Sequence, residues 1–216
     1  TGLVRDYAFT VVNDEDLLPG LVMAGVLDTI DRTLDRIGPG TAKVYFELTG
    51  ANFPSFQREN LFCGKDIAAA ALLEFGEMLR VVTENEFIKP ELTGVNLRVK
   101  VSPEQRNAKI NKVDLPQKQF APGEKVTLTV DLLPFRGEAV QTPLEVTLPA
   151  TPGKWLLMVY GNQYGFTSEE QGSNADQLYH PESYPAYTSL EKKLADYRRR
   201  PQNNQLVVEF LPAEGM

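Results

Sequence analysis

Cysteine and histidine could supply a nucleophile and a base in this chain of 216 residues, and each occurs once. Cys63 ends an apolar segment, whereas His180 lies far along the chain in a polar loop. A reactive thiol needs a nearby base, and a Ser-His-Asp triad would also require this histidine. Motifs of the Gly-x-Ser-x-Gly, HExxH, P-loop and GxGxxG types are absent from the sequence. We interpret Cys63 as an inert, half-buried thiol and His180 as a solvated loop residue, with a Cys-His dyad as the alternative, and predict no catalytic residue.

The 29 carboxylates are the remaining candidates for acid-base catalysis or metal binding, and no pair of them stands out. Residues 14–16 (Asp-Glu-Asp) are similar to the beginning of a calcium loop, but the spaced ligands, glycine and terminal glutamate of an EF-hand are missing. An apolar helical pattern follows them, so we predict that they cap a helix. One cysteine and one histidine also exclude a multi-cysteine zinc site and a disulfide framework. The sequence therefore predicts neither a metal nor a cofactor.

Basic side chains are outnumbered, since 22 Lys and Arg against 29 Asp and Glu give a net charge of −7. Binding to a phosphate backbone needs a basic face, so we do not expect nucleic acid as a partner. The one basic cluster, residues 198–200 (Arg-Arg-Arg), ends a predicted helix and complements its dipole there, with an anionic partner as the alternative. No apolar run approaches the length of a membrane span.

Aromatic side chains gather in the polar loop over residues 160–187. They are Tyr160, Tyr164, Phe166, Tyr179, Tyr184 and Tyr187. Such a loop can form a recognition surface, and it can equally be pinned by its aromatic rings onto a neighbouring sheet. We take Tyr164, Phe166, Tyr179 and Tyr184 as candidate binding residues.

A turn is predicted over residues 133–138 (Leu-Pro-Phe-Arg-Gly-Glu), where Pro134 ends a strand and Gly137 permits the reversal. Arg136 can pair there with Glu138 or with a loop carbonyl. We favour such a turn clamp over a ligand site, and we keep Arg136 as a further candidate binding residue.

The N-terminal half alternates strand and helix patterns in the order β-α-β-β-α-β. The predicted strands are 3–12, 41–49, 56–63 and 92–101, and the predicted helices are 18–37 and 67–85. Gly38-Pro39-Gly40 ends the first helix, and Asp66 is placed to cap the second. This order is typical of a ferredoxin-like α+β unit, a motif without an intrinsic function.

The C-terminal half reads as short strands separated by Pro-Gly turns, which is typical of an immunoglobulin-like antiparallel β-sandwich. The predicted strands are 107–115, 126–133, 143–148, 155–160 and 206–211, with one short amphipathic helix over 189–199. We therefore predict two domains, a ferredoxin-like one over 1–104 and a sandwich over 105–216. The last strand, 206–211, is a candidate edge strand through which two copies could pair.

Short motifs follow one another along the whole chain. They are Asn60, 64–67 (Gly-Lys-Asp-Ile), 85–87 (Asn-Glu-Phe), 108–110 (Ala-Lys-Ile), 121–126 (Ala-Pro-Gly-Glu-Lys-Val), 133–138, 148–149 (Leu-Pro), 152–153 (Pro-Gly), 189–191 (Ser-Leu-Glu) and 203–208 (Asn-Asn-Gln-Leu-Val-Val). In this order the chain resembles the non-catalytic C-terminal region of bacterial SpoIVB-type proteins, which belong to peptidase family S55.

The resemblance implies an accessory or interaction module rather than an enzyme. In such proteins the serine-peptidase domain lies upstream, and its catalytic His and Ser have no matching positions here. The implied partners are that upstream domain or an envelope protein, and the implied location is extracytoplasmic. The chain begins at Thr1 without a signal peptide, which we interpret as trimming, with an intact cytoplasmic protein as the alternative. The alternative function is glycan or peptide binding through the aromatic loop 160–187.

Overall fold

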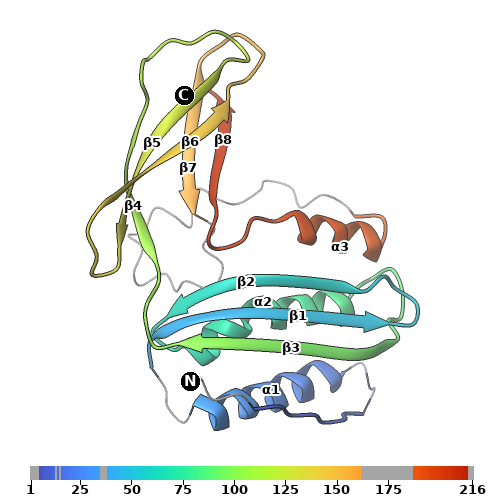
Figure 1. Cartoon of the computed structure of the whole chain (residues 1–216). Helices are drawn as coiled ribbons and strands as arrows, with labels where there is room; N and C mark the ends of the chain where they lie inside the picture. Colours follow the sequence, from blue (N-terminus) through green and yellow to red (C-terminus); the bar gives the residue numbers. More distant parts are fainter. Residues whose placement is uncertain (1–4, 13, 15, 35–37, 162–186, 214–216) are drawn as a thin grey trace. The chain divides into compact units, whose positions relative to one another are not determined.

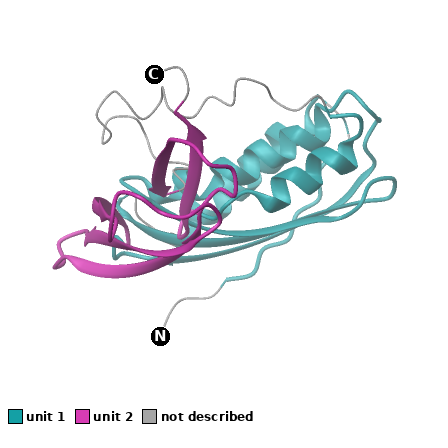
Figure 2. Ribbon diagram, turned by 90° about the horizontal axis from the view of Figure 1, so that it is seen from above, with its two compact units in different colours: residues 1–105, 163–202 teal, residues 106–162, 203–216 magenta. Residues whose placement is uncertain are grey.

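The computed structural model describes residues 5–12, 14, 16–34, 38–161 and 187–213. It is an α+β structure, as predicted, and it divides into two compact units. The first unit comprises residues 1–105 and 163–202, and the second comprises 106–162 and 203–216 (Figure 2). We expected one C-terminal domain over 105–216, whereas the chain passes between the units after residues 105, 162 and 202.

The first unit contains a three-stranded antiparallel sheet with one buried face. Its strands β1 (Gly40–Gly50), β2 (Phe56–Gly64) and β3 (Leu92–Ser102) lie in the order β2-β1-β3 (Figure 1). Side chains alternate between the two faces of a strand, so in β1 Phe46 is buried while the preceding Tyr45 is only half-buried. The β1 strand is central, because β2 and β3 pair with its two edges.

Helices α1 (Leu18–Leu34) and α2 (Ile67–Thr83) share one hydrophobic core with the inner face of this sheet. From α2, the ring of Phe75 packs edge-on against Phe46, with 5.6 Å between the ring centroids. Asp66 caps this helix as predicted, since its side chain accepts a hydrogen bond of 3.2 Å from the backbone N–H of Ala69. The core thus fixes α2 against β1 and β2.

Residues 5–12 form no strand, so the strand predicted over 3–12 is wrong for its described part. The segment lies along α1 instead, where the Phe9 ring is so close to Gly25 that a Cβ there would meet it at 2.7 Å. In addition, the Arg5 guanidinium donates to the Arg32 carbonyl. Both edges of β1 are already occupied by β2 and β3, which leaves no place beside β1 for a further strand. The ferredoxin-like arrangement is therefore not confirmed.

The second unit consists of antiparallel strands in two small sheets. One sheet has the order β4-β5-β6, with β4 (Ala108–Asp114), β5 (Lys125–Pro134) and β6 (Val140–Thr147), and the other pairs β7 (Trp155–Gly161) with β8 (Leu206–Pro212). Among its described residues, the buried side chains are Val126, Leu128, Val130 and Val146. All five predicted strands are present, whereas the immunoglobulin-like arrangement is not confirmed.

Helix α3 (Leu190–Arg199) forms where predicted, and the Ser189 hydroxyl caps it by accepting 3.2 Å from the backbone N–H of Lys192. Its buried residues are Leu190, Leu194 and Tyr197, as the amphipathic pattern predicts. These side chains join the core of the first unit, although we expected the helix in the C-terminal domain. None of the described helices is long and apolar enough to cross a membrane.

Candidate functional site

Four polar side chains are buried among the described residues, all of them in the first unit. They are Thr41, Arg58, Asn60 and Glu74. Arg58 and Asn60 lie two positions apart on β2, so the alternation of the strand turns both toward the helices. Glu74 lies on the face of α2 that packs on the sheet. The fold thus brings a cation, an amide and a carboxylate together inside the first unit.

Glu74 accepts hydrogen bonds from both β2 side chains. The Nε of Arg58 donates to its Oε1, and the Nδ2 of Asn60 donates to its Oε2 at 2.9 Å. The side chains of Arg58 and Glu74 are 6% and 5% exposed. An isolated charge at such burial would be strongly unfavourable, so each of the two is tolerated because the other neutralises it.

The remaining donors of the Arg58 guanidinium bind the C-terminal end of α3. Nη1 donates to the carbonyl oxygens of Tyr197 at 3.2 Å and Arg200 at 3.0 Å, and Nη2 donates to that of Pro201 at 3.0 Å. The last carbonyls of a helix have no partner within the helix and carry its partial negative charge. A guanidinium at this position satisfies them, and we call Arg58, Asn60 and Glu74 the helix clamp.

Contacts around the clamp hold α3 from its side as well. The Tyr197 hydroxyl donates to Oε1 of Glu77 at 2.7 Å, and the Arg200 guanidinium lies 3.4 Å from the centroid of the Tyr197 ring. Burial, and secondarily the hydrogen bond to Glu77, raise the pKa of Tyr197 above its ordinary value. Arg198 donates to the carbonyl of Ser55 at 2.9 Å. The arginine cluster 198–200 therefore lies at a helix C-terminus, as predicted, with two of its members in intramolecular contacts.

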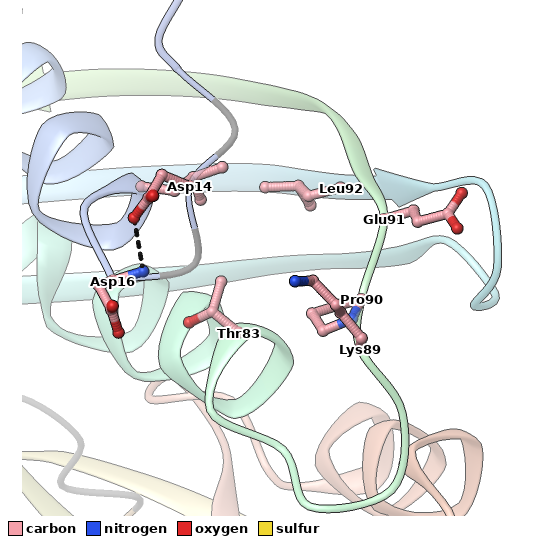
Figure 3. A pocket seen from close by; sticks show the side chains of 8 residues that line it. Asp14, Asp16, Thr83, Lys89, Pro90, Glu91 and Leu92 are labelled. Carbon is pink, nitrogen blue, oxygen red and sulfur yellow. Dashed lines mark hydrogen bonds between the residues drawn. The ribbon is translucent and has the colours of Figure 1, made fainter.

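A pocket of about 330 Å³ lies at the beginning of α1 in the first unit (Figure 3). Its lining includes Asp14, Asp16, Lys89 and Glu91. The Asp14 carboxylate accepts 3.1 Å hydrogen bonds from the backbone N–H groups of Asp16 and Leu17, which confirms the predicted helix cap. Figure 3 shows the Glu91 carboxylate pointing away from the two aspartates. Among the described residues, no group of acidic, His or Cys side chains could hold a metal.

The loop beside this pocket is held by amide side chains. Asn52 donates to the carbonyl of Lys89 and accepts from the N–H of Glu91, both at 2.9 Å, and Asn85 accepts from two backbone N–H groups of the same loop. The pocket is thus bordered by groups whose polar atoms maintain the backbone. This arrangement indicates a structural role.

The turn over residues 133–138 forms as predicted, with the Gly137 N–H donating to the Pro134 carbonyl at 3.1 Å. Its positive φ falls on Arg136, at 54°, instead of on the glycine. We expected Arg136 to pair with Glu138 or a carbonyl, whereas its guanidinium lies over the Phe135 ring, 5.0 Å from the centroid. An exposed ion pair contributes little, so contact with the ring face competes with it readily.

Several predicted site residues lie outside the described residues. These are His180, Tyr164, Phe166, Tyr179 and Tyr184. The two ends of the aromatic segment are described, and each is anchored: the Tyr160 hydroxyl donates to Glu209 and that of Tyr187 to Asp196. Cys63 is buried in β2, deeper than the half-buried position that we expected.

Sequence reasoning missed the helix clamp, although the sequence contains a signal for it. Residues 56–62 alternate so that Phe56, Arg58, Asn60 and Phe62 share the inner face of β2. A cation and an amide between two buried phenylalanines predict a buried acidic partner. That partner, Glu74, stands in an otherwise apolar stretch of α2.

Comparison with protein-family models, with curated proteins and with solved structures finds no match to this chain. A proposal for its function therefore rests on the residues and contacts described above.

Proposed function

We propose that this chain is a non-catalytic accessory or interaction module of a larger protein. The observation that supports it most is the helix clamp, because Arg58 and Glu74 are the only buried charged residues among those described. Catalytic acids and bases typically combine burial with an open face toward a substrate. Here Glu74 binds Arg58 and Asn60, and the guanidinium binds three carbonyls at the end of α3. The buried charges thus hold the fold together.

The proposal includes the relationship to exported bacterial SpoIVB-type peptidase proteins, with an upstream peptidase domain or an envelope protein as the partner. Its support is the order of short motifs, one of which forms the exposed turn at 134–137. The finer fold prediction, a ferredoxin-like unit and an immunoglobulin-like sandwich, belongs to the same proposal. Antiparallel pairing in the described sheets and helices on one face of the first sheet support it, whereas the strand predicted over 3–12 is missing from its described part. Glycan binding and pairing through 206–211 stay predictions.

An activity screen tests the absence of catalysis directly. The full chain is incubated with broad peptidase and ester substrates, and we expect no turnover above that of buffer. Cys63→Ala and His180→Ala variants are assayed in parallel, with circular dichroism to show that each is folded. Turnover by the wild-type chain that either substitution abolishes would contradict the proposal.

A further inference from the structure

The turn between β5 and β6 exposes large apolar side chains. Leu133 and Phe135 are each 44% exposed and Val140 is 52% exposed. Leu133 lies opposite Lys109 of β4, on the face of the sheet that points away from the buried Leu128 and Val130. Val140 pairs with Leu132 and therefore lies on the other face. We call Leu133, Phe135 and Arg136 the β5–β6 tip. Apolar side chains of this size on a protruding turn contribute little to the core of their own unit.

The backbone of the tip is strained at Arg136. Its φ of 54° makes it the one non-glycine residue with a positive φ among those described. Glycine adopts this conformation freely, whereas a residue with a Cβ does so at a disadvantage, and a glycine stands at the very next position. Residues held in such conformations cluster at functional sites, so the outlier singles out Arg136 as a candidate contact residue.

The Arg136 guanidinium is held in place without being neutralised. It lies over the exposed Phe135 ring, and no described carboxylate forms an ion pair with it. Lys109, beside Leu133, has no ion-pair partner among the described residues either, while Glu138 in the same turn offsets part of their charge. The tip therefore presents two unpaired cations around two exposed apolar side chains.

We propose that the β5–β6 tip is the surface through which this module binds an acidic segment of a partner protein, with a carboxylate beside an apolar side chain. This inference rests on the proposed interaction function. The cations select a carboxylate, and Leu133 and Phe135 receive the apolar neighbour. The net charge of −7 opposes a second copy of the same chain as the occupant. A single turn is a small contact area, which is typical of weak, transient binding.

A matched arginine exists in the first unit. The Arg98 guanidinium lies 5.6 Å from the centroid of the Tyr45 ring, so it too is an exposed arginine over an aromatic ring. It belongs to a regular strand, β3, with a negative φ and no exposed large apolar residue beside it on β1. Arg98→Glu therefore changes charge by the same amount as Arg136→Glu in a setting without the proposed site.

The test is a selection of a random dodecapeptide library on the immobilised full chain, followed by affinity measurements on the enriched peptides by fluorescence anisotropy. We expect enriched sequences with Asp or Glu beside a large apolar residue. Phe135→Ala and Arg136→Glu are expected to weaken their binding about tenfold or more, and Arg98→Glu to leave it unchanged. Arg136→Gly removes the side chain and relieves the strain, so it should weaken binding while raising the midpoint of urea unfolding.

Each other outcome overturns the proposal in a distinguishable way. Enriched peptides that bind the tip variants as well as the wild type would overturn the tip and preserve the interaction function. No enrichment from the library would count against both. Concentration-dependent dimerisation that Phe135→Ala abolishes would assign the tip to a second copy. A fall in both binding and stability for Arg136→Gly would mean that the arginine serves the fold instead.

Discussion

At the scale of the residue, Arg136 takes the positive φ that the sequence assigns to its neighbouring glycine. A residue with a Cβ is disfavoured in this region by roughly 1–2 kcal/mol relative to glycine. Glycine gives the unfolded chain more conformational entropy, and this cancels part of the stability gained by relieving the strain. Arg136→Gly should therefore raise the free energy of unfolding of the second unit by about 0.5–1 kcal/mol. Fluorescence of Trp155, the single tryptophan, reports on this unit.

Gly123 provides the opposite substitution for this measurement. Its φ of 74° lies in the same region, and nothing surrounds the position where a Cβ would be. Gly123→Ala should lower the unfolding free energy by about 1 kcal/mol through backbone strain alone. If Arg136→Gly and Gly123→Ala both lowered the unfolding free energy, the assignment of strain to Arg136 would be contradicted.

The helix clamp is the second residue-scale feature with a measurable consequence. Removing one partner leaves the other as an uncompensated buried charge, so Glu74→Ala should destabilise the first unit by about 3–5 kcal/mol. The exposed pair of Arg32 and Asp28 is the control, and Asp28→Ala should cost less than about 1 kcal/mol. Both are read from urea unfolding followed by circular dichroism. Similar losses for the two variants would show that the clamp is not a buried ion pair in solution.

At the scale of the element, α3 should respond to alkaline pH through Tyr197. Burial raises the pKa of Tyr197 in the folded chain, so the neutral phenol is preferred there. The contribution of Tyr197 to the free energy of unfolding is complete below its pKa in the unfolded chain, near 10. That contribution is lost as pH rises toward the higher pKa of the folded chain. Unfolding free energies from about pH 9 to about pH 11 should therefore fall, and more steeply for wild type than for Tyr197→Phe. If the unfolding free energy of Tyr197→Phe fell with pH as steeply as that of wild type, the pH dependence could not be assigned to Tyr197.

Most elements could be predicted from the sequence, because periodic burial and caps are local properties. The alternation in β1 and the cap at Asp66 are read directly from residue types. The segment 5–12 shows the limit of this reasoning. Its alternating Tyr7, Phe9 and Val11 predict a strand. A strand also needs a neighbouring strand with a free edge, and the local sequence does not show whether one is present.

The candidate site was less predictable, since it depends on contacts between distant parts of the chain. The carbonyls that Arg58 binds belong to residues 197–201, and no local pattern joins them to β2. For the same reason the amphipathic face of α3 was predicted while its host unit was not. At the β5–β6 tip, the turn was predicted from Pro134 and Gly137, but the strained residue was not.

At the scale of the whole molecule, the two units contain hydrophobic cores of very different size. Within the part of the chain that the structure describes, the first unit includes the three helices and most of the buried side chains, whereas the second buries four valine and leucine residues. A small core gives a marginal free energy of unfolding. Trp155 fluorescence should therefore change at lower urea concentration than the helical circular dichroism signal. Coincident transitions would show one cooperative structure in place of two.

The central claim is that this chain binds a partner through the tip of its second unit. The most direct measurement is a map of amide chemical-shift changes in the full, ¹⁵N-labelled chain upon titration with a peptide enriched in the selection. We expect changes centred on Lys109 and residues 133–140, and we expect Arg136→Glu to abolish them. Changes centred on the pocket at Asp14 and Lys89, or on residues 162–186, would contradict it.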